Sequence, residues 1–322
     1  MSKPDWVLRH YRADSDADLF RLLKLYNEVE AYDRDPNPST EADLRAQLKW
    51  QGHDPAHDRW VVESPDDPDR LIGYGRVFAQ SPERTVIWVL VHSAWRRQKI
   101  GTLLLQRALE RAREQGATHV TSTTIAEDVI GTAFLTCNHF SAAGDNWSLL
   151  APQDLSSEAP CWPEGYTVRT YAQVQHLPTL VEVLNRCYRD MWGHRENTPG
   201  AVNEQYLSQA MIRHPEIYIP EGMFIIFAPD GSVAGFCRAE FEAYDAKKLK
   251  IVDGPGVVPE HRPQGLWRPL VLTAMQWLNR QQAGPVTLYA WGDSAKTIEI
   301  YQELGFTLQE HWIEYKRELR LE

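Results

Sequence analysis

The sequence predicts an α+β fold in which one unit, a central mixed β-sheet flanked by helices, occurs twice in tandem. Three observations point to it. Val91 and Val257 lie 166 residues apart, and so do Phe140 and Phe306. This offset holds over about fifty residues without a gap, which indicates two copies of one unit. A stretch rich in Pro, Ser and acidic residues, 152–165, separates two halves of nearly equal length and is typical of a linker.

The chain has 322 residues, which corresponds to about two domains of ordinary size. We therefore expect an N-terminal domain over residues 1–151, a linker over 152–165 and a C-terminal domain over 166–322. Each copy shows the same order of elements: a strand, helices, three strands, a helix, a strand, a helix and a strand.

The elements follow from local patterns. Short alternating segments open both copies, and apolar residues at helical spacing follow them. A strand pattern, Leu71–Arg76 in the first copy and Val233–Arg238 in the second, matches at an offset of 162. The later offset of 166 predicts a loop that is four residues longer in the second copy. An amphipathic helix then follows, from about 102 to 114 in the first copy and around 270–278 in the second.

Composition disfavours several classes of function. The 34 Lys and Arg residues against 44 Asp and Glu leave a formal net charge of −10, which disfavours nucleic-acid binding. No run of about 18 apolar residues is present, and the first residues lack the apolar core of a signal peptide, so we expect no membrane span. The four cysteines lack C-x-x-C spacing, which is typical of reduced thiols in a cytoplasmic protein. The histidines show no metal-ligand spacing, and we expect no metal site.

A short basic loop between a Val-rich strand and a helix is the first chemical motif, and both copies have it. Free N–H groups and the helix dipole at such a joint favour phosphate groups. We therefore expect pyrophosphate binding at these loops, although a solvated basic turn is the alternative for either loop taken alone. The candidate binding residues are Val89, Val91, Arg96, Arg97, Gln98, Lys99, Gly101 and Thr102 in the first copy, and Val257, Val258, Arg262, Gln264, Gly265, Trp267 and Arg268 in the second.

These loops resemble the acyl-CoA signature of the GNAT-fold N-acetyltransferases, Gln/Arg-x-x-Gly-x-Gly/Ala, and the resemblance covers nearly all of both halves. The signature falls on residues 96–101 and 262–267. Each copy departs from it once, because Lys99 replaces the first glycine of one loop and Trp267 the second glycine of the other. A lysine does not easily take a backbone conformation that favours glycine. The arrangement is similar to that of two-domain, mycothiol-synthase-like acetyltransferases.

The resemblance implies that acetyl-CoA is the co-substrate and that a primary amine of a small molecule attacks its thioester directly. Tyr301, in a Tyr-x-x-x-Gly-Phe segment, matches the tyrosine that faces the departing thiolate in this family, whereas the first copy has Leu135 there. A packing residue is the alternative role for Tyr301. A base must also take a proton from the ammonium form of the amine. The carboxylates considered for this step are Glu240, Glu242, Asp253 and Glu260, of which we assign Glu240 and Asp253.

The segment 253–258, Asp-Gly-Pro-Gly-Val-Val, is consistent with a bulge that opens the strand before the second loop. In this family, main-chain groups of such a strand hold the thioester, so the resemblance implies that the chemistry lies in the C-terminal domain. Two alternatives stay open: the N-terminal copy is the working one, or the chain is a CoA-binding or interaction module without catalysis. The sequence leaves the acceptor and the oligomeric state undetermined.

Overall fold

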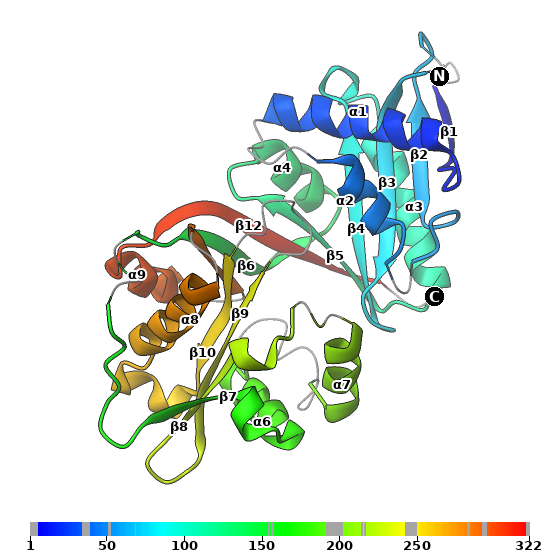
Figure 1. The fold of residues 1–322 in the computed structure, drawn as a ribbon. Helices are drawn as coiled ribbons and strands as arrows, with labels where there is room; N and C mark the ends of the chain where they lie inside the picture. Colours follow the sequence, from blue (N-terminus) through cyan, green and yellow to red (C-terminus); the bar gives the residue numbers. More distant parts are fainter. Residues whose placement is uncertain are drawn as a thin grey trace. The chain divides into compact units, whose positions relative to one another are not determined.

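A computed structural model describes the chain over residues 6–33, 39–50, 53–67, 69–153, 155, 158–190, 202–213, 215, 217–241, 250–281, 284–291 and 295–319. The chain forms two compact units (Figure 1). Unit 1 takes in residues 1–124, 130–142 and 314–322, and unit 2 takes in residues 125–129 and 143–313. Each unit therefore contains a segment from the other half of the sequence.

Unit 1 is built on strands in the order β1-β2-β3-β4-β5-β12. Strands β1 to β4 are antiparallel neighbours, and β4 pairs in parallel with β5. Helices α1 and α2 lie on one face of the sheet and α3 on the other (Figure 1). The bounds are β1 (Val7–His10), α1 (Asp16–Asp33), α2 (Glu41–Gln47), β2 (Arg59–Glu63), β3 (Leu71–Ala79), β4 (Arg84–Val91), α3 (Ile100–Glu114), β5 (His119–Ile125), α4 (Val129–Cys137) and β12 (Thr307–Glu318).

Two glycines of β3 explain how closely α3 packs on unit 1. A Cβ atom at Gly73 would lie 2.8 Å from Cγ2 of Ile100, and one at Gly75 would lie 3.3 Å from Leu104. Helix α3 begins with Ile100 and buries Leu104 completely. Small residues on the strand thus bring the helix that follows the basic loop against β3.

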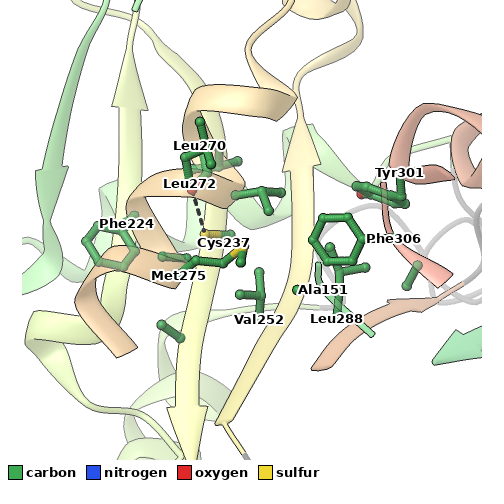
Figure 2. Packing of buried hydrophobic residues seen from close by; sticks show 14 of the residues in the cluster. Ala151, Phe224, Cys237, Val252, Leu270, Leu272, Met275, Leu288, Tyr301 and Phe306 are labelled. Carbon is green, nitrogen blue, oxygen red and sulfur yellow. Dashed lines mark hydrogen bonds between the residues drawn. The ribbon is translucent and has the colours of Figure 1, made fainter. Parts of the chain in front are cut away.

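Unit 2 repeats this plan with strands in the order β12-β6-β11-β10-β9-β8-β7. Its α8 face holds a large apolar core that includes Cys237, Val252, Leu270 and Met275 (Figure 2). The α6 face holds a second core around Leu180. The bounds are β6 (Ser141–Leu150), β7 (Thr167–Thr170), α5 (Tyr171–Val174), α6 (Leu177–Cys187), α7 (Glu204–Arg213), β8 (Met223–Phe227), β9 (Val233–Phe241), β10 (Lys250–Val257), α8 (Trp267–Gln281), β11 (Val286–Trp291) and α9 (Ala295–Glu303).

The predicted repeat is confirmed by the bounds of these elements. Strand β9 begins 162 residues after β3 and has the same length. Strand β10 begins 166 residues after β4, and α9 begins 166 residues after α4, again with equal lengths. The four extra residues fall between β9 and β10, where residues 242–249 lie outside the described part of the chain.

The compact units do not coincide with the two consecutive halves of the sequence. The end of β12 belongs to unit 1, where the main-chain N–H of Leu319 donates to the carbonyl of Thr118 at 2.8 Å. Arg317 donates to the carbonyl of Asn138 at 2.9 Å. Most of β6, from residue 143, belongs to unit 2, where it pairs with β11. The boundaries at 151 and 166 stay a prediction about the repeat, while each folded unit takes in part of the last strand of the other copy.

Candidate functional site

The parallel strands β10 and β11 separate in the middle of unit 2. Their ladder runs from Lys250, opposite Val286, to Asp253, opposite Tyr289. From there the register of β10 on β9 shifts between Asp253 and Gly256. The predicted bulge is therefore confirmed, and it begins where the ladder with β11 ends. A bulge of this kind frees main-chain groups that a regular ladder would engage.

Two side chains converge on the bulge carbonyl of Pro255. The hydroxyl of Tyr301 on α9 donates to it at 3.4 Å, and Nε1 of Trp267 at the start of α8 donates to it at 3.2 Å. Tyr301 is fully buried and its ring lies against Phe306 (Figure 2). It therefore packs in the core and also directs its hydroxyl at the bulge of β10. Water is excluded around this hydroxyl, which strengthens any hydrogen bond to a developing charge.

An arginine and two carboxylates line the α6 face beside the bulge. Arg238 on β9 forms ion pairs with both Glu240 and Asp253. Burial alone would lower the pKa of Arg238, but the charges of Asp253 and Glu240 outweigh it and raise that pKa. The ring of Tyr218 stacks on the guanidinium at 4.7 Å. The three charged groups sum to one negative charge next to the strand opening.

The four carboxylates considered as bases differ in position. Asp253 begins the bulge and keeps 33% of its side chain exposed. Glu240 is 8% exposed and faces Ile251, one strand step further from the opening. Glu260 is exposed and pairs with Arg189 at 2.6 Å. Glu242 lies outside the described residues. Of the described candidates, Asp253 lies at the start of the bulge, whereas Glu240 lies further along the strand, paired with Arg238.

The first arginine of each loop makes the same internal contact. Nε of Arg96 donates to the carbonyl of Val91 at 3.2 Å, and Nε of Arg262 donates to that of Val257 at 3.1 Å. These bonds tie each loop to the end of its strand. Arg262 is also held by both carboxylate oxygens of Asp190, at 2.6 and 2.7 Å.

The two loops differ in how many of their cationic side chains pair with a carboxylate. Arg268 pairs with Glu158, so both arginines of the second loop have carboxylate partners. Arg97 and Lys99 of the first loop are exposed and form no ion pair within the described part of the chain. Of the other predicted binding residues, Gln98, Thr102, Gln264 and Gly265 are exposed, Val89, Val91, Gly101 and Trp267 are partly exposed, and Val257 and Val258 are buried.

The two loops share a left-handed backbone position although their residues differ there. Lys99 does take the left-handed conformation, with a φ of 66°, at the position where the second copy has Gly265 with a φ of 71°. His139 likewise has a φ of 65°, where the second copy has Gly305 with 89°. The loop geometry thus prevails over the residue preference at an expected cost of about 1–2 kcal/mol per residue. Such strain is typical of sites that hold a ligand.

Sequence reasoning did not single out three residues that shape this site. Arg238 lies two residues before Glu240 on one strand, so strand alternation could have placed both on one face. Tyr188, after α6, donates its hydroxyl to the carbonyl of Gly254 in the bulge. Asp190 neutralises Arg262. The last two contacts join distant segments, and no local pattern indicates them.

The described part of the chain shows no group of three or more His, Cys, Asp or Glu side chains arranged to hold a metal ion. Within the same residues, no helix combines the length and the apolar character needed to cross a membrane.

Comparisons with known proteins place this geometry in a family. The model of the acetyltransferase (GNAT) family matches residues 22–136 and 177–306. A mycothiol acetyltransferase of Saccharomonospora viridis is 26% identical over 258 residues, covering 76% of this chain and 79% of the relative. One of Sanguibacter keddieii is 26% identical over 257 residues, covering 77% and 78%.

Solved structures agree on the fold. A GCN5-related N-acetyltransferase from Sphaerobacter thermophilus superposes with a TM-score of 0.80 at 18% identity, covering 100% of this chain and 98% of that one. A tandem GNAT protein from the clavulanic acid biosynthesis pathway gives a TM-score of 0.69 at 20% identity, covering 98% and 99%. The chain therefore belongs to the GNAT acetyltransferase family, as an N-acetyltransferase built from two copies of its fold.

Proposed function

We propose that the chain transfers an acetyl group from acetyl-CoA to a primary amine of a small molecule, at the opening between β10 and β11. The observation that carries this proposal is the bulge itself. Asp253 begins it, and the hydroxyl of Tyr301 reaches the carbonyl of Pro255 in its middle. A candidate base and a candidate hydrogen-bond donor therefore meet where the strands part. The relatives named mycothiol acetyltransferase support an acetyl-transfer reaction.

The roles of the residues follow from their chemistry. Acetyl-CoA supplies the thioester, whose C–S bond breaks as the new C–N bond forms. Asp253 takes the proton that the ammonium must lose, directly or through one water molecule. The Tyr301 hydroxyl exchanges its bond to Pro255 for one to the sulfur, to which it donates as negative charge develops there. A free phenol titrates near pH 10 and a free thiol near 8.5, so a hydrogen bond is favoured over full proton transfer.

The charge of the site favours a cationic acceptor. Glu240, Asp253 and Arg238 together leave one negative charge beside the opening. An ammonium group is attracted to such a site, and the overall net charge of −10 acts in the same direction.

The test is turnover of acetyl-CoA with a panel of primary amines, followed by release of the CoA thiol. We expect Tyr301→Phe to lower kcat about 100-fold, because it removes one donor to developing charge. Leu135→Met, at the equivalent position of the first copy, is the matched control and should leave kcat unchanged. Full activity of Tyr301→Phe would move the chemistry to the N-terminal copy. Thiol release that no amine accelerates would contradict acetyl transfer to an amine.

A second CoA site at the first loop is supported by the cationic side chains there that have no carboxylate partner among the described residues. Arg97 and Lys99 are exposed, whereas Arg262 and Arg268 are paired with carboxylates. We expect calorimetry with acetyl-CoA to give two sites on the full chain, which must be kept whole because the units exchange strands. Lys99→Gly keeps the backbone conformation and removes the charge, so it should weaken one of the two sites. A single site with unchanged affinity in this variant would contradict the assignment.

A further inference from the structure

Two arginines stand directly opposite each other on the α1 face of unit 1. Arg59 on β2 and Arg76 on β3 are register partners, and Trp88 on β4 is the next partner in the same row. Directly opposed residues of an antiparallel pair share one face, so the two guanidinium groups lie on the same side of the sheet. Arg59 is completely buried and Arg76 is partly exposed. Like charges in this arrangement repel each other.

Neither arginine forms a direct ion pair with a carboxylate within the described residues, and the buried Asp58 lies on the far side of His53, at 3.4 Å from its Nδ1. Arg59 donates to Nε2 of His53 at 2.7 Å and to the carbonyl of Gln47 at 3.0 Å. Arg76 donates to Oε1 of Gln47 at 2.7 Å, and its guanidinium lies 4.7 Å from the centre of the Trp50 ring. A buried charge without a counter-ion is costly, so this pair needs an explanation.

The same cluster contains polar groups with no partner. The hydroxyls of Tyr11, Tyr26 and Tyr74 are shielded from solvent and form no hydrogen bond among the described residues. The same holds for Nη1 of Arg59 and Nε1 of Trp88. Buried polar atoms are nearly always bonded in folded proteins, so five such atoms in one place are unusual.

These groups lie close to one another. The rings of Tyr26 and Tyr74 are 5.8 Å apart, and the guanidinium of Arg59 lies 5.8 Å from the centre of the Tyr11 ring. Burial raises the pKa of Tyr26, and the charges of Arg76 and Arg59 act against this rise, which places both cations within range of its hydroxyl. Burial also raises the pKa of Tyr11 to about 12. The hydroxyls of Tyr11 and Tyr26 are thus protonated donors at neutral pH.

We propose that this cluster binds the carboxylate or phosphate group of a small anionic ligand. Two guanidinium groups, three hydroxyls and an indole N–H supply donors and positive charge, which is the chemistry that recognises an oxyanion. Arg76, Trp50 and Trp88 are partly exposed and form the open side of the cluster, so the uncharged part of the ligand lies against the two indoles. The proposal does not rest on the acetyl transfer assigned to unit 2.

The test is calorimetry on the full chain, with succinate and inorganic phosphate titrated separately at constant ionic strength. We expect saturable binding of one of these anions, and which anion binds separates the two ligand chemistries. Tyr74→Phe should weaken this binding about tenfold, since a hydroxyl that bonds a charged group is lost. Its melting temperature without ligand should stay equal or rise, because the hydroxyl it removes has no partner. Arg59→Met should abolish binding.

Tyr315→Phe is the matched control in the same unit. Its hydroxyl has a partner, Oγ1 of Thr132 at 3.4 Å, so this variant should bind the anion normally and not gain stability. Three results would overturn the proposal. Neither anion binds saturably, or Arg59→Met and Tyr74→Phe bind as tightly as the parent, or Tyr74→Phe loses thermal stability while its affinity is unchanged. Activity with acetyl-CoA enters none of these readings, so failure here is distinct from failure of the proposed reaction.

Discussion

The two copies carry an arginine at the same place on the third strand of the repeat, and its surroundings are opposite in charge. Arg238 in unit 2 pairs with Glu240 and Asp253. The positions equivalent to these carboxylates in unit 1 hold Phe78 and Ile87. The strand beside Arg76 contributes Arg59, whereas the strand beside Arg238 contributes Met223. One fold therefore holds a net negative cluster in one copy and a net positive cluster in the other, and the ligands must be inferred from each site separately.

The strands beside the two arginines differ as well. In unit 1, β4 stays in register with β3 from Thr85 to Val91. In unit 2, the corresponding β10 carries the bulge from Asp253 to Gly256. The features that suit acetyl transfer, namely the bulge, Tyr301 and Asp253, are thus found together in unit 2. Unit 1 keeps the loop cations and the cluster without counter-ions.

The largest effect is expected from removing residues 314–322. Unit 1 would lose the end of β12, where Tyr315 and Leu319 are buried and Glu314 pairs with Arg84. The truncation removes two buried side chains and the partner of a buried arginine. We therefore expect the free energy of unfolding of unit 1 to fall by about 5 kcal/mol. Hydrogen exchange should show faster exchange in β1 to β5 than in β8 to β10. Equal protection of both sets of strands would mean that the units do not depend on the exchanged strand.

The next effect concerns the negative cluster of unit 2. Asp253→Asn should lower kcat about 100-fold, because the base is lost. Glu240→Gln should cost about tenfold or less, since this carboxylate acts through Arg238. Glu260→Gln, on an exposed carboxylate, is the control and should have no effect. Steady-state kinetics with the best amine of the panel measures all three. If Asp253→Asn and Glu240→Gln lower kcat equally, Asp253 does not act as the base with Glu240 as a positioning residue.

A smaller effect tests the strained loop positions. Gly265→Lys should destabilise unit 2 by about 1–2 kcal/mol, and Lys99→Gly should stabilise unit 1 by about 1 kcal/mol. A Cβ atom at Gly265 would meet no heavy atom within 4 Å, so the first change tests backbone conformation alone. Denaturant unfolding measures both variants. If both variants change the free energy of unfolding in the same direction, the left-handed conformation is not the cause of the difference in stability between the two loop positions.

The smallest effect is the response of unit 1 to acid. Burial opposes ionisation of Asp58, but hydrogen bonds from His53 and Arg111 outweigh it, so the pKa of Asp58 is lowered. In the unfolded chain the pKa of Asp58 is about 4, so near this pH the unfolded state binds more protons than the folded state. The stability that Asp58 contributes is therefore present above this pH and is lost as the pH falls through the lower pKa of the folded state. Unfolding at a series of pH values below about 4.5 should show this loss, and Asp58→Asn should flatten it. An equally steep loss in the variant would assign the acid response to other carboxylates.

The sequence by itself determined the repeat and the position of the bulge in its second copy. Equal spacing of apolar and glycine positions predicted two copies, because each element needs its own periodicity to bury one face. The Gly-Pro-Gly segment predicted the bulge that begins at Asp253, since proline and glycine do not suit a regular central strand.

The tertiary structure alone decided which strands and side chains meet. Strands β6 and β12 occupy equivalent positions in the two copies, so their local patterns cannot select a partner, and the folded chain places their ends in opposite units. The pairing of Arg59 with Arg76 depends on a register between strands that are distant in sequence. Lys99 takes the same left-handed conformation as Gly265, which the preference of a lysine does not predict. The repeat could be read from the chain because it is local, whereas the two charged clusters result from long-range pairing.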